Sequence, residues 1–148
     1  MKRLLKLLRS RGGKKLFLQT YITMSLIRLG LLLLPFSRLQ ELITKVKGWN
    51  FLAVASSEVN IRAIVIGVYR SGKYQPGNPM CLARALTTSV LMGIYSLPHQ
   101  INIGVAKGKD GRIEAHAWVV SKDIVIVGNL PDLDRYTPMS SQGERLII

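Results

Sequence analysis

The pattern of apolar and polar positions predicts helices over the first half of the chain. Leucines alternate with lysines and arginines over residues 2–15, which is typical of a short cationic amphipathic helix, and Gly12-Gly13 are expected to break it. Residues 16–34 are mostly apolar and stop at Pro35. Residues 37–47 repeat apolar positions at helical spacing, so a second helix is predicted after the proline.

Ser37 is a candidate N-cap for this second helix, because a serine hydroxyl can accept from the free N–H groups of a first turn. Residues 51–69 carry their apolar side chains at helical rather than alternating spacing, which indicates another helix. Residues 69–79 hold two prolines and two glycines and are expected to form a loop.

A further helix is expected to begin near Cys81 and to end at Gly93. Three apolar segments separated by turns follow, at residues 101–106, 114–120 and 124–127, and they predict an antiparallel meander. The fold class is therefore α+β, with N-terminal helices and a central cysteine-bearing helix packed on an antiparallel sheet. Residues 1–50 form the basic, leucine-rich helical region and residues 51–148 the core, in one compact unit.

Charge is concentrated at the N-terminus. The chain of 148 residues has a formal net charge of +13, and residues 1–47 carry eleven Lys or Arg and one Glu. Residues 48–148 carry only a small positive excess, ten Lys or Arg against seven Asp or Glu. Such a distribution favours an anionic partner, either a membrane surface or an acidic peptide or protein. Nucleic acid is not expected, because no RNA-stacking aromatic motif, zinc finger or helix-turn-helix pattern accompanies the charge.

The apolar run at residues 16–34 raises the question of a membrane span. Arg28 lies near its middle, where a charge costs about 2.5–3.5 kcal/mol on insertion. Polar residues dilute the rest, and no small-residue cleavage site follows. We therefore expect a buried core helix with one polar edge. Peripheral membrane contact is the first alternative and a membrane span is the second. The expected location is cytoplasmic, which a single free cysteine fits.

Cys81 is the candidate nucleophile. One cysteine excludes an internal disulfide and a cysteine-rich zinc site, and with only two histidines no metal or other cofactor is expected. Asn78 and Pro79 precede it as a cap and a first-turn proline, which puts the sulfur at a helix N-terminus. The free N–H groups there lower the pKa of a thiol and can stabilise an oxyanion. The alternative is that Cys81 is a small buried hydrophobic residue.

His116 is the candidate base. It heads an apolar strand in the segment Ala-His-Ala-Trp-Val, and alternation places Trp118 on the same strand face, where it can shield the imidazole from water. The alternative is an ordinary core histidine beside an ordinary core tryptophan. The other histidine, His99, falls in a predicted loop and is expected at the surface.

A general base needs an acceptor that orients its ring. If the hairpin turn is centred near Lys122, His116 lies opposite Gly128 or Asn129. The Asn129 amide is the favoured acceptor, and the Asp132 carboxylate, which follows in the next loop, is the second candidate.

Four segments together resemble the lasso-peptide biosynthesis leader peptidases, small cysteine peptidases of the transglutaminase-like, papain-related superfamily. The segments are Cys-Leu-Ala-Arg-Ala-Leu at 81–86, Asn-Ile-Gly-Val at 102–105, Ala-His-Ala-Trp-Val at 115–119, and Pro-Asp with Arg-Tyr-Thr-Pro at 131–138. The resemblance covers roughly residues 60–140 and implies a transglutaminase-like cysteine-peptidase fold. It also implies Cys81 and His116 as catalytic residues of a Cys-His-Asp triad. At the strand end, where the family commonly has the acid, this chain reads Val127-Gly128-Asn129 and has no acidic residue.

The resemblance also implies a task and partners. The enzyme would remove the leader from a ribosomally synthesised lasso-peptide precursor and free the core peptide's amine for a separate macrolactam cyclase. A separate RiPP recognition element protein would hold the leader, because a chain of 148 residues leaves no evident room for that module. Transfer of the acyl group to an amine instead of water is a variation on this chemistry. A non-catalytic, cationic membrane-associated or adaptor protein is the alternative function.

Overall fold

The computed structural model describes residues 11–47, 60–77 and 81–139. Within these ranges the helices are α2 Arg11–Leu33, α3 Phe36–Lys47, α4 Ile61–Tyr74 and α5 Cys81–Ile94. The strands are β1 Gln100–Lys107, β2 Ile113–Ser121, β3 Ile124–Val127 and β4 Thr137–Pro138, with a 3-10 turn, η2 Leu133–Arg135, before the last. Their spatial order is β3-β2-β1-β4 and the pairings are antiparallel, which confirms the α+β prediction.

The β2–β3 hairpin has a tight two-residue turn. Lys122 and Asp123 both adopt positive φ angles, of 50° and 63°, the backbone shape that suits the right-handed twist of paired strands. Ser121 then pairs with Ile124, but an irregularity shifts the register so that Val119 pairs with Val127. Because β3 ends at Val127, the chain leaves the sheet beside His116.

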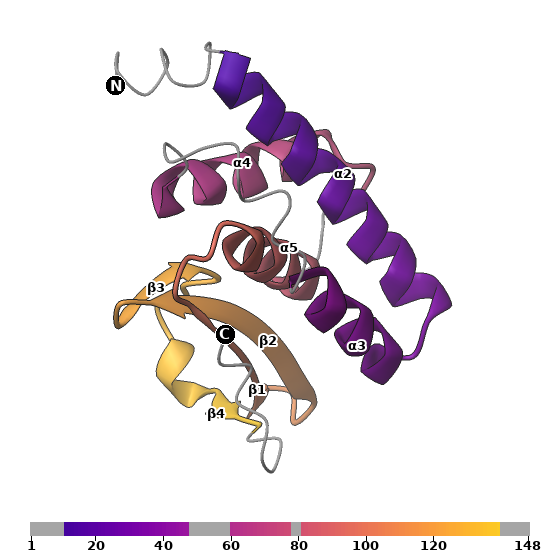
Figure 1. Ribbon diagram of the computed structural model, residues 1–148. Helices are drawn as coiled ribbons and strands as arrows, with labels where there is room; N and C mark the ends of the chain where they lie inside the picture. Colours follow the sequence, from indigo (N-terminus) through magenta and orange to yellow (C-terminus); the bar gives the residue numbers. More distant parts are fainter. Residues whose placement is uncertain (1–10, 48–59, 78–80, 140–148) are drawn as a thin grey trace.

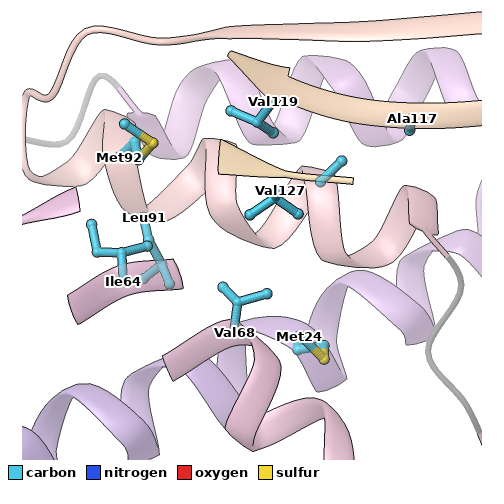
Figure 2. Packing of buried hydrophobic residues seen from close by; sticks show 9 residues of the cluster. Met24, Ile64, Val68, Leu91, Met92, Ala117, Val119 and Val127 are labelled. Atoms are coloured by element: carbon cyan, nitrogen blue, oxygen red, sulfur yellow. The ribbon is translucent and has the colours of Figure 1, made fainter. Parts of the chain in front are cut away.

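Helix α5 lies at the centre of the fold (Figure 1), packed on β1, β2 and β3 on one side and on α2, α3 and α4 on the other. Alternation along β2 turns Ala117 and Val119 toward the helices, where they meet side chains from three helices (Figure 2). The fully buried members of this core are Met24, Ile64, Val68, Ala85, Leu91, Met92, Ala117, Val119 and Val127. The side chains at odd positions of β2 thus anchor the sheet on α5, and the even positions are left for the opposite face.

Three helix boundaries differ from the sequence predictions. Gly12-Gly13 do not break the chain, because α2 runs through them. Ser37 is inside α3, whose first turn is closed by the Leu39 N–H donating to the Pro35 carbonyl. Residues 69–74, predicted as loop, belong to α4. The Asn60 side chain accepts from the Ala63 N–H at its start, and the helix continues because Ser71 and Gly72 are small enough to be buried against its neighbours.

Helix α2 packs on α4 and α5, but the prediction of a buried core helix with one polar edge is wrong, because most of its apolar section is not buried. Leu16, Met24 and Ile27 are buried against the domain, whereas the exposed edge carries leucines and an isoleucine. Its section Gly13–Leu33 is long and apolar enough to cross a membrane by length and composition, alone among the described helices. The predicted boundary between residues 1–50 and 51–148 falls in a segment outside the described residues.

Candidate active site

Cys81 is the first described residue of α5 and is half-buried. The capping pair Asn78 and Pro79 lies outside the described residues. The residues that follow the cysteine hold this turn in place, because Leu82 packs against the core and Ala83 is almost fully buried. The sulfur is therefore carried on a helical turn that the core anchors.

The imidazole of His116 lies against two aromatic rings on the sheet face opposite the helices. It stacks on Trp118, with ring centroids 6.1 Å apart and an angle of 15° between the planes, as the shared strand face predicted. Tyr136 contacts it from the segment before β4, at a centroid distance of 5.5 Å. Trp118 and Tyr136 are both buried, so the ring of His116 is shielded on these sides and half-buried overall.

A short hydrogen bond orients this imidazole. His116 Nε2 lies 2.6 Å from the carbonyl oxygen of Gly128. A carbonyl oxygen only accepts, so Nε2 carries the hydrogen and donates it. In the neutral ring the lone pair is then on Nδ1, which is left as the basic atom. The bond therefore fixes the orientation of the ring and leaves Nδ1 as its accepting nitrogen.

Gly128 occupies a position that only glycine fits. Its φ is +82°, and a Cβ there would lie 2.6 Å from the Ala117 carbonyl oxygen and 2.9 Å from Trp118 Cβ. Sequence reasoning looked for a side-chain acceptor and missed this backbone oxygen, which leaves no side-chain signal. The glycine itself, at the end of a short strand, was the available clue.

Gly128 is also contacted from the helical side of the sheet. Its N–H donates to the hydroxyl of Tyr69 on α4, at 3.4 Å. The guanidinium of Arg84, one helical turn after Cys81, lies over the Tyr69 ring at 5.5 Å from its centroid. The cysteine's turn and the histidine's acceptor are thus joined through Arg84 and Tyr69, two residues that sequence reasoning did not single out.

Cys81 and His116 themselves are not joined by a hydrogen bond in the described part of the chain. The structure does not bring their side chains together, because α5 packs on the sheet face of Ala117 and Val119, whereas the His116 ring stacks on Trp118 on the opposite face.

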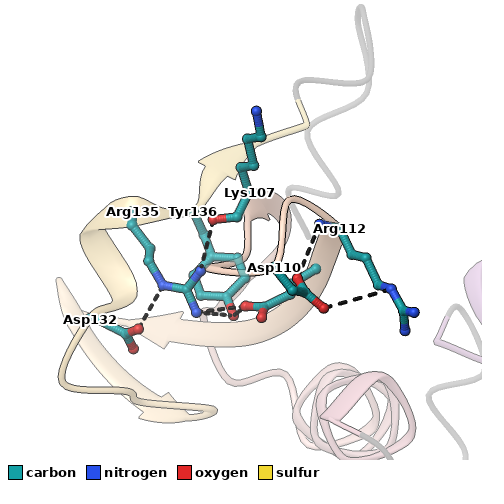
Figure 3. Close-up of polar contacts among 7 residues, drawn as sticks. Lys107, Asp110, Arg112, Asp132, Arg135 and Tyr136 are labelled. Atoms are coloured by element: carbon teal, nitrogen blue, oxygen red, sulfur yellow. Dashed lines mark hydrogen bonds and ion pairs between the residues drawn. The ribbon is translucent and has the colours of Figure 1, made fainter.

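The two candidate third members have different surroundings. Asn129 is exposed, and among the described residues it makes no hydrogen bond to His116. Asp132 Oδ2 accepts from Arg135 Nε at 2.6 Å, within a network that Figure 3 shows. Arg135 donates in turn to Glu114 Oε2, also at 2.6 Å. Both residues stay candidates, and the acceptor that His116 uses is the backbone of Gly128.

Electrostatics around this network are set by Arg135 and by burial. The hydrogen bond from Arg135 holds the pKa of Asp132 below its ordinary value, and the nearby charge of His116 lowers the pKa of Asp132 further. Burial raises the pKa of the Tyr136 phenol. Asp132 is therefore an anion near the imidazole at neutral pH, held by Arg135 rather than by His116.

His99 is not at the surface, contrary to the prediction. It is 7% exposed, and its Nδ1 lies 2.9 Å from the Leu97 carbonyl oxygen, to which it donates. Its Nε2 lies 2.9 Å from the hydroxyl of Ser89 on α5. The loop before β1 folds against α5, which buries this histidine as a structural element. Across residues 11–47, 60–77 and 81–139, no group of three or more His, Cys, Asp or Glu side chains is placed to hold a metal ion.

Comparison with known proteins yields one match. A family model described as the transglutaminase-like superfamily matches residues 30–141, about three quarters of the chain, and this range includes Cys81, His116 and Gly128. No curated protein and no solved structure matches the chain.

Proposed function

Because the chain belongs to the transglutaminase-like superfamily, we propose that it is a cysteine peptidase with Cys81 as nucleophile and His116 as base. The superfamily commonly has cysteine-dependent activity and includes cysteine peptidases. The observation that carries the proposal is the 2.6 Å bond from His116 Nε2 to the Gly128 carbonyl oxygen. This bond selects the ring form in which Nδ1 is free to accept the thiol proton.

The reaction proceeds in two steps. Cys81 passes its proton to His116 Nδ1, and the thiolate attacks the carbonyl carbon of the peptide bond. The C–N bond breaks as the imidazolium protonates the leaving amine, and the acyl group stays on sulfur. His116 then takes a proton from water, the resulting hydroxide attacks the thioester, and the thiolate leaves as a carboxylic acid forms. Trp118 and Tyr136 limit the access of bulk water to the ring.

The substrate that we propose is the leader–core bond of a ribosomally synthesised lasso-peptide precursor. The resemblance of segments 81–86, 102–105, 115–119 and 131–138 to leader peptidases supports this choice. A separate RiPP recognition element protein would present the leader, and a macrolactam cyclase would consume the freed core amine.

Reconstituted cleavage tests the proposal. The full chain is mixed with a lasso-peptide precursor and its recognition protein, and the masses of the products are measured by mass spectrometry. We expect a leader with a free carboxylate and a core peptide with a free amine. Cys81→Ala should abolish cleavage, and His116→Ala should slow it by about 10²–10⁴-fold. Retained cleavage by folded Cys81→Ala would end the proposal, and a leader joined to an added amine would show acyl transfer instead.

The orienting acceptor is tested separately. If the Gly128 carbonyl orients the ring, Asn129→Ala and Asp132→Ala should each keep the cleavage rate within about threefold. Neither substitution removes the hydrogen bond that orients the imidazole. A loss of about 10³-fold or more in either variant would assign the third catalytic role to that side chain.

Thiol alkylation separates catalysis from the alternative of a non-catalytic cationic adaptor. Iodoacetamide should modify Cys81 in the native chain at neutral pH, and His116→Ala should slow the reaction because the sulfur loses its base. The matched control is His99→Gln, which replaces the buried structural histidine and leaves the site histidine in place. Equal rates in the native and His116→Ala proteins would favour the adaptor.

A further inference from the structure

Helix α2 has an unusual distribution of side chains, since its exposed edge is apolar. Five large apolar residues recur at intervals of four, four, three and four positions and form a continuous stripe, with Leu32 at its side. They are Leu18 at 58% exposed, Ile22 at 49%, Leu26 at 62%, Leu29 at 52% and Leu33 at 71%. We call this surface the α2 stripe. No other described element has comparable exposed apolar side chains in a row.

Three polar side chains in the middle of α2 contact the domain instead. Gln19 accepts from the Tyr95 hydroxyl at 2.6 Å, and Ser25 accepts from Gln75 Nε2 at 2.8 Å. Arg28 donates to Gln75 Oε1 at 3.3 Å. These bonds, together with the packing of α2 on α4 and α5, fix the rotation of the helix. The α2 stripe therefore cannot turn inward without breaking these hydrogen bonds.

The charge around the α2 stripe is positive. Lys14 and Lys15 are exposed in the turn before Leu18, and Arg38 and Lys45 are exposed on α3, which packs against α2. Glu41 is the one acidic residue in residues 1–47. A row of aliphatic side chains that begins next to two lysines matches the layered chemistry of a bilayer surface, in which anionic headgroups lie above acyl chains.

We propose that the α2 stripe docks on an anionic phospholipid membrane, with the helix lying along the surface. A protein partner is less well matched, because the α2 stripe contains only aliphatic side chains and lacks the aromatic and arginine anchors that dominate protein interfaces. A membrane span is also less well matched, because Gln19, Ser25 and Arg28 are bound to the domain. The proposal goes beyond peptidase chemistry and does not depend on it.

Vesicle co-sedimentation of the full chain tests this proposal. The vesicles contain phosphatidylcholine with about one third phosphatidylglycerol, or phosphatidylcholine alone. We expect binding to the anionic vesicles only. Raising the salt from about 0.1 M to about 1 M should weaken it roughly tenfold, because the Debye length falls from about 10 Å to about 3 Å.

Substitutions locate the surface. Ile22→Glu with Leu29→Glu should weaken vesicle binding roughly tenfold or more, because two inserted side chains become charged. The matched control is Ile113→Glu with Ile124→Glu, which changes two isoleucines that are 79% and 65% exposed on the sheet and should leave binding within about twofold. Circular dichroism checks that both variants fold.

Three results would overturn the proposal. Equal vesicle binding by the native chain and the Ile22→Glu/Leu29→Glu variant would show that the α2 stripe is not the contact. Absence of vesicle binding together with a dimer that this variant dissociates, seen by light scattering, would assign the α2 stripe to a second copy. Resistance of vesicle-bound protein to alkaline carbonate extraction would show insertion across the bilayer instead of surface docking.

Discussion

Substitution of Gly128 by alanine tests how the fold holds the candidate base. The residue has a φ of +82°, and its carbonyl oxygen accepts the Nε2–H of His116 at 2.6 Å. An alanine Cβ would lie 2.6 Å from the Ala117 carbonyl oxygen, a backbone atom that cannot rotate away. The chain must therefore move at the point where the imidazole is anchored.

The expected cost has two parts. A side chain in the left-handed region costs about 1–2 kcal/mol. Relief of the contact with Ala117 by moving backbone adds about 1–2 kcal/mol, so Gly128→Ala should lower the free energy of unfolding by about 2–4 kcal/mol. The chain should still fold, because domains of this kind have about 5–15 kcal/mol of stability. The matched control is Gly111→Ala, since Gly111 has a φ of +81° with nothing within 4 Å of its would-be Cβ. It should lose only the first part.

The effect on chemistry follows from the lost hydrogen bond. A bond of this kind has a net value of about 0.5–1.5 kcal/mol. Because about 1.4 kcal/mol is a factor of ten in rate, cleavage by Gly128→Ala should slow about two- to twelvefold, and Gly111→Ala should cleave at the native rate.

Urea denaturation measures the stabilities, and single-turnover cleavage measures the rates. Nitrogen NMR of the His116 ring reports whether the hydrogen is on Nε2, independently of any substrate. The reasoning is refuted if Gly128→Ala and Gly111→Ala lose the same stability and the His116 ring keeps its native tautomer in both. A change in the tautomer without a change in the cleavage rate would instead contradict the proposal that His116 is the base.

Two further predictions concern the core and the charged network. Leu91→Ala should lower the free energy of unfolding by about 2–5 kcal/mol, because the side chain is fully buried. Ile113→Ala, at an exposed site, should stay within about 0.5 kcal/mol, and equal losses in urea denaturation would contradict the core assignment. Arg135→Ala should raise the pKa of Asp132 toward its ordinary value, since the hydrogen bond from Arg135 is the main cause that lowers it. In the native chain this stabilisation is complete above about pH 4 and is lost as the pH falls through the depressed pKa; an unchanged carboxyl titration by NMR would contradict the assignment.

Parts of the candidate site could be predicted from the local sequence. Alternation along β2 put His116 and Trp118 on one face, and their rings stack. The Lys122-Asp123 turn was placed correctly, but the shift between Val119 and Val120 was not, because register irregularities depend on how the strand packs.

The sequence by itself determined the element types over most of the described chain, the α+β class, and a thiol and an imidazole on neighbouring elements. These follow from periodicity and turn residues, which are local properties. Only the tertiary structure decided that His116 is anchored by the Gly128 carbonyl, that His99 is buried, and that α2 turns its leucines outward. The physical reason is that hydrophobicity is a property of each residue, whereas burial and hydrogen-bond partners depend on which elements share a surface. Gln75 and Tyr95, which lie outside α2, supply hydrogen-bond partners for the polar side chains of α2. The apolar edge of α2 is left exposed.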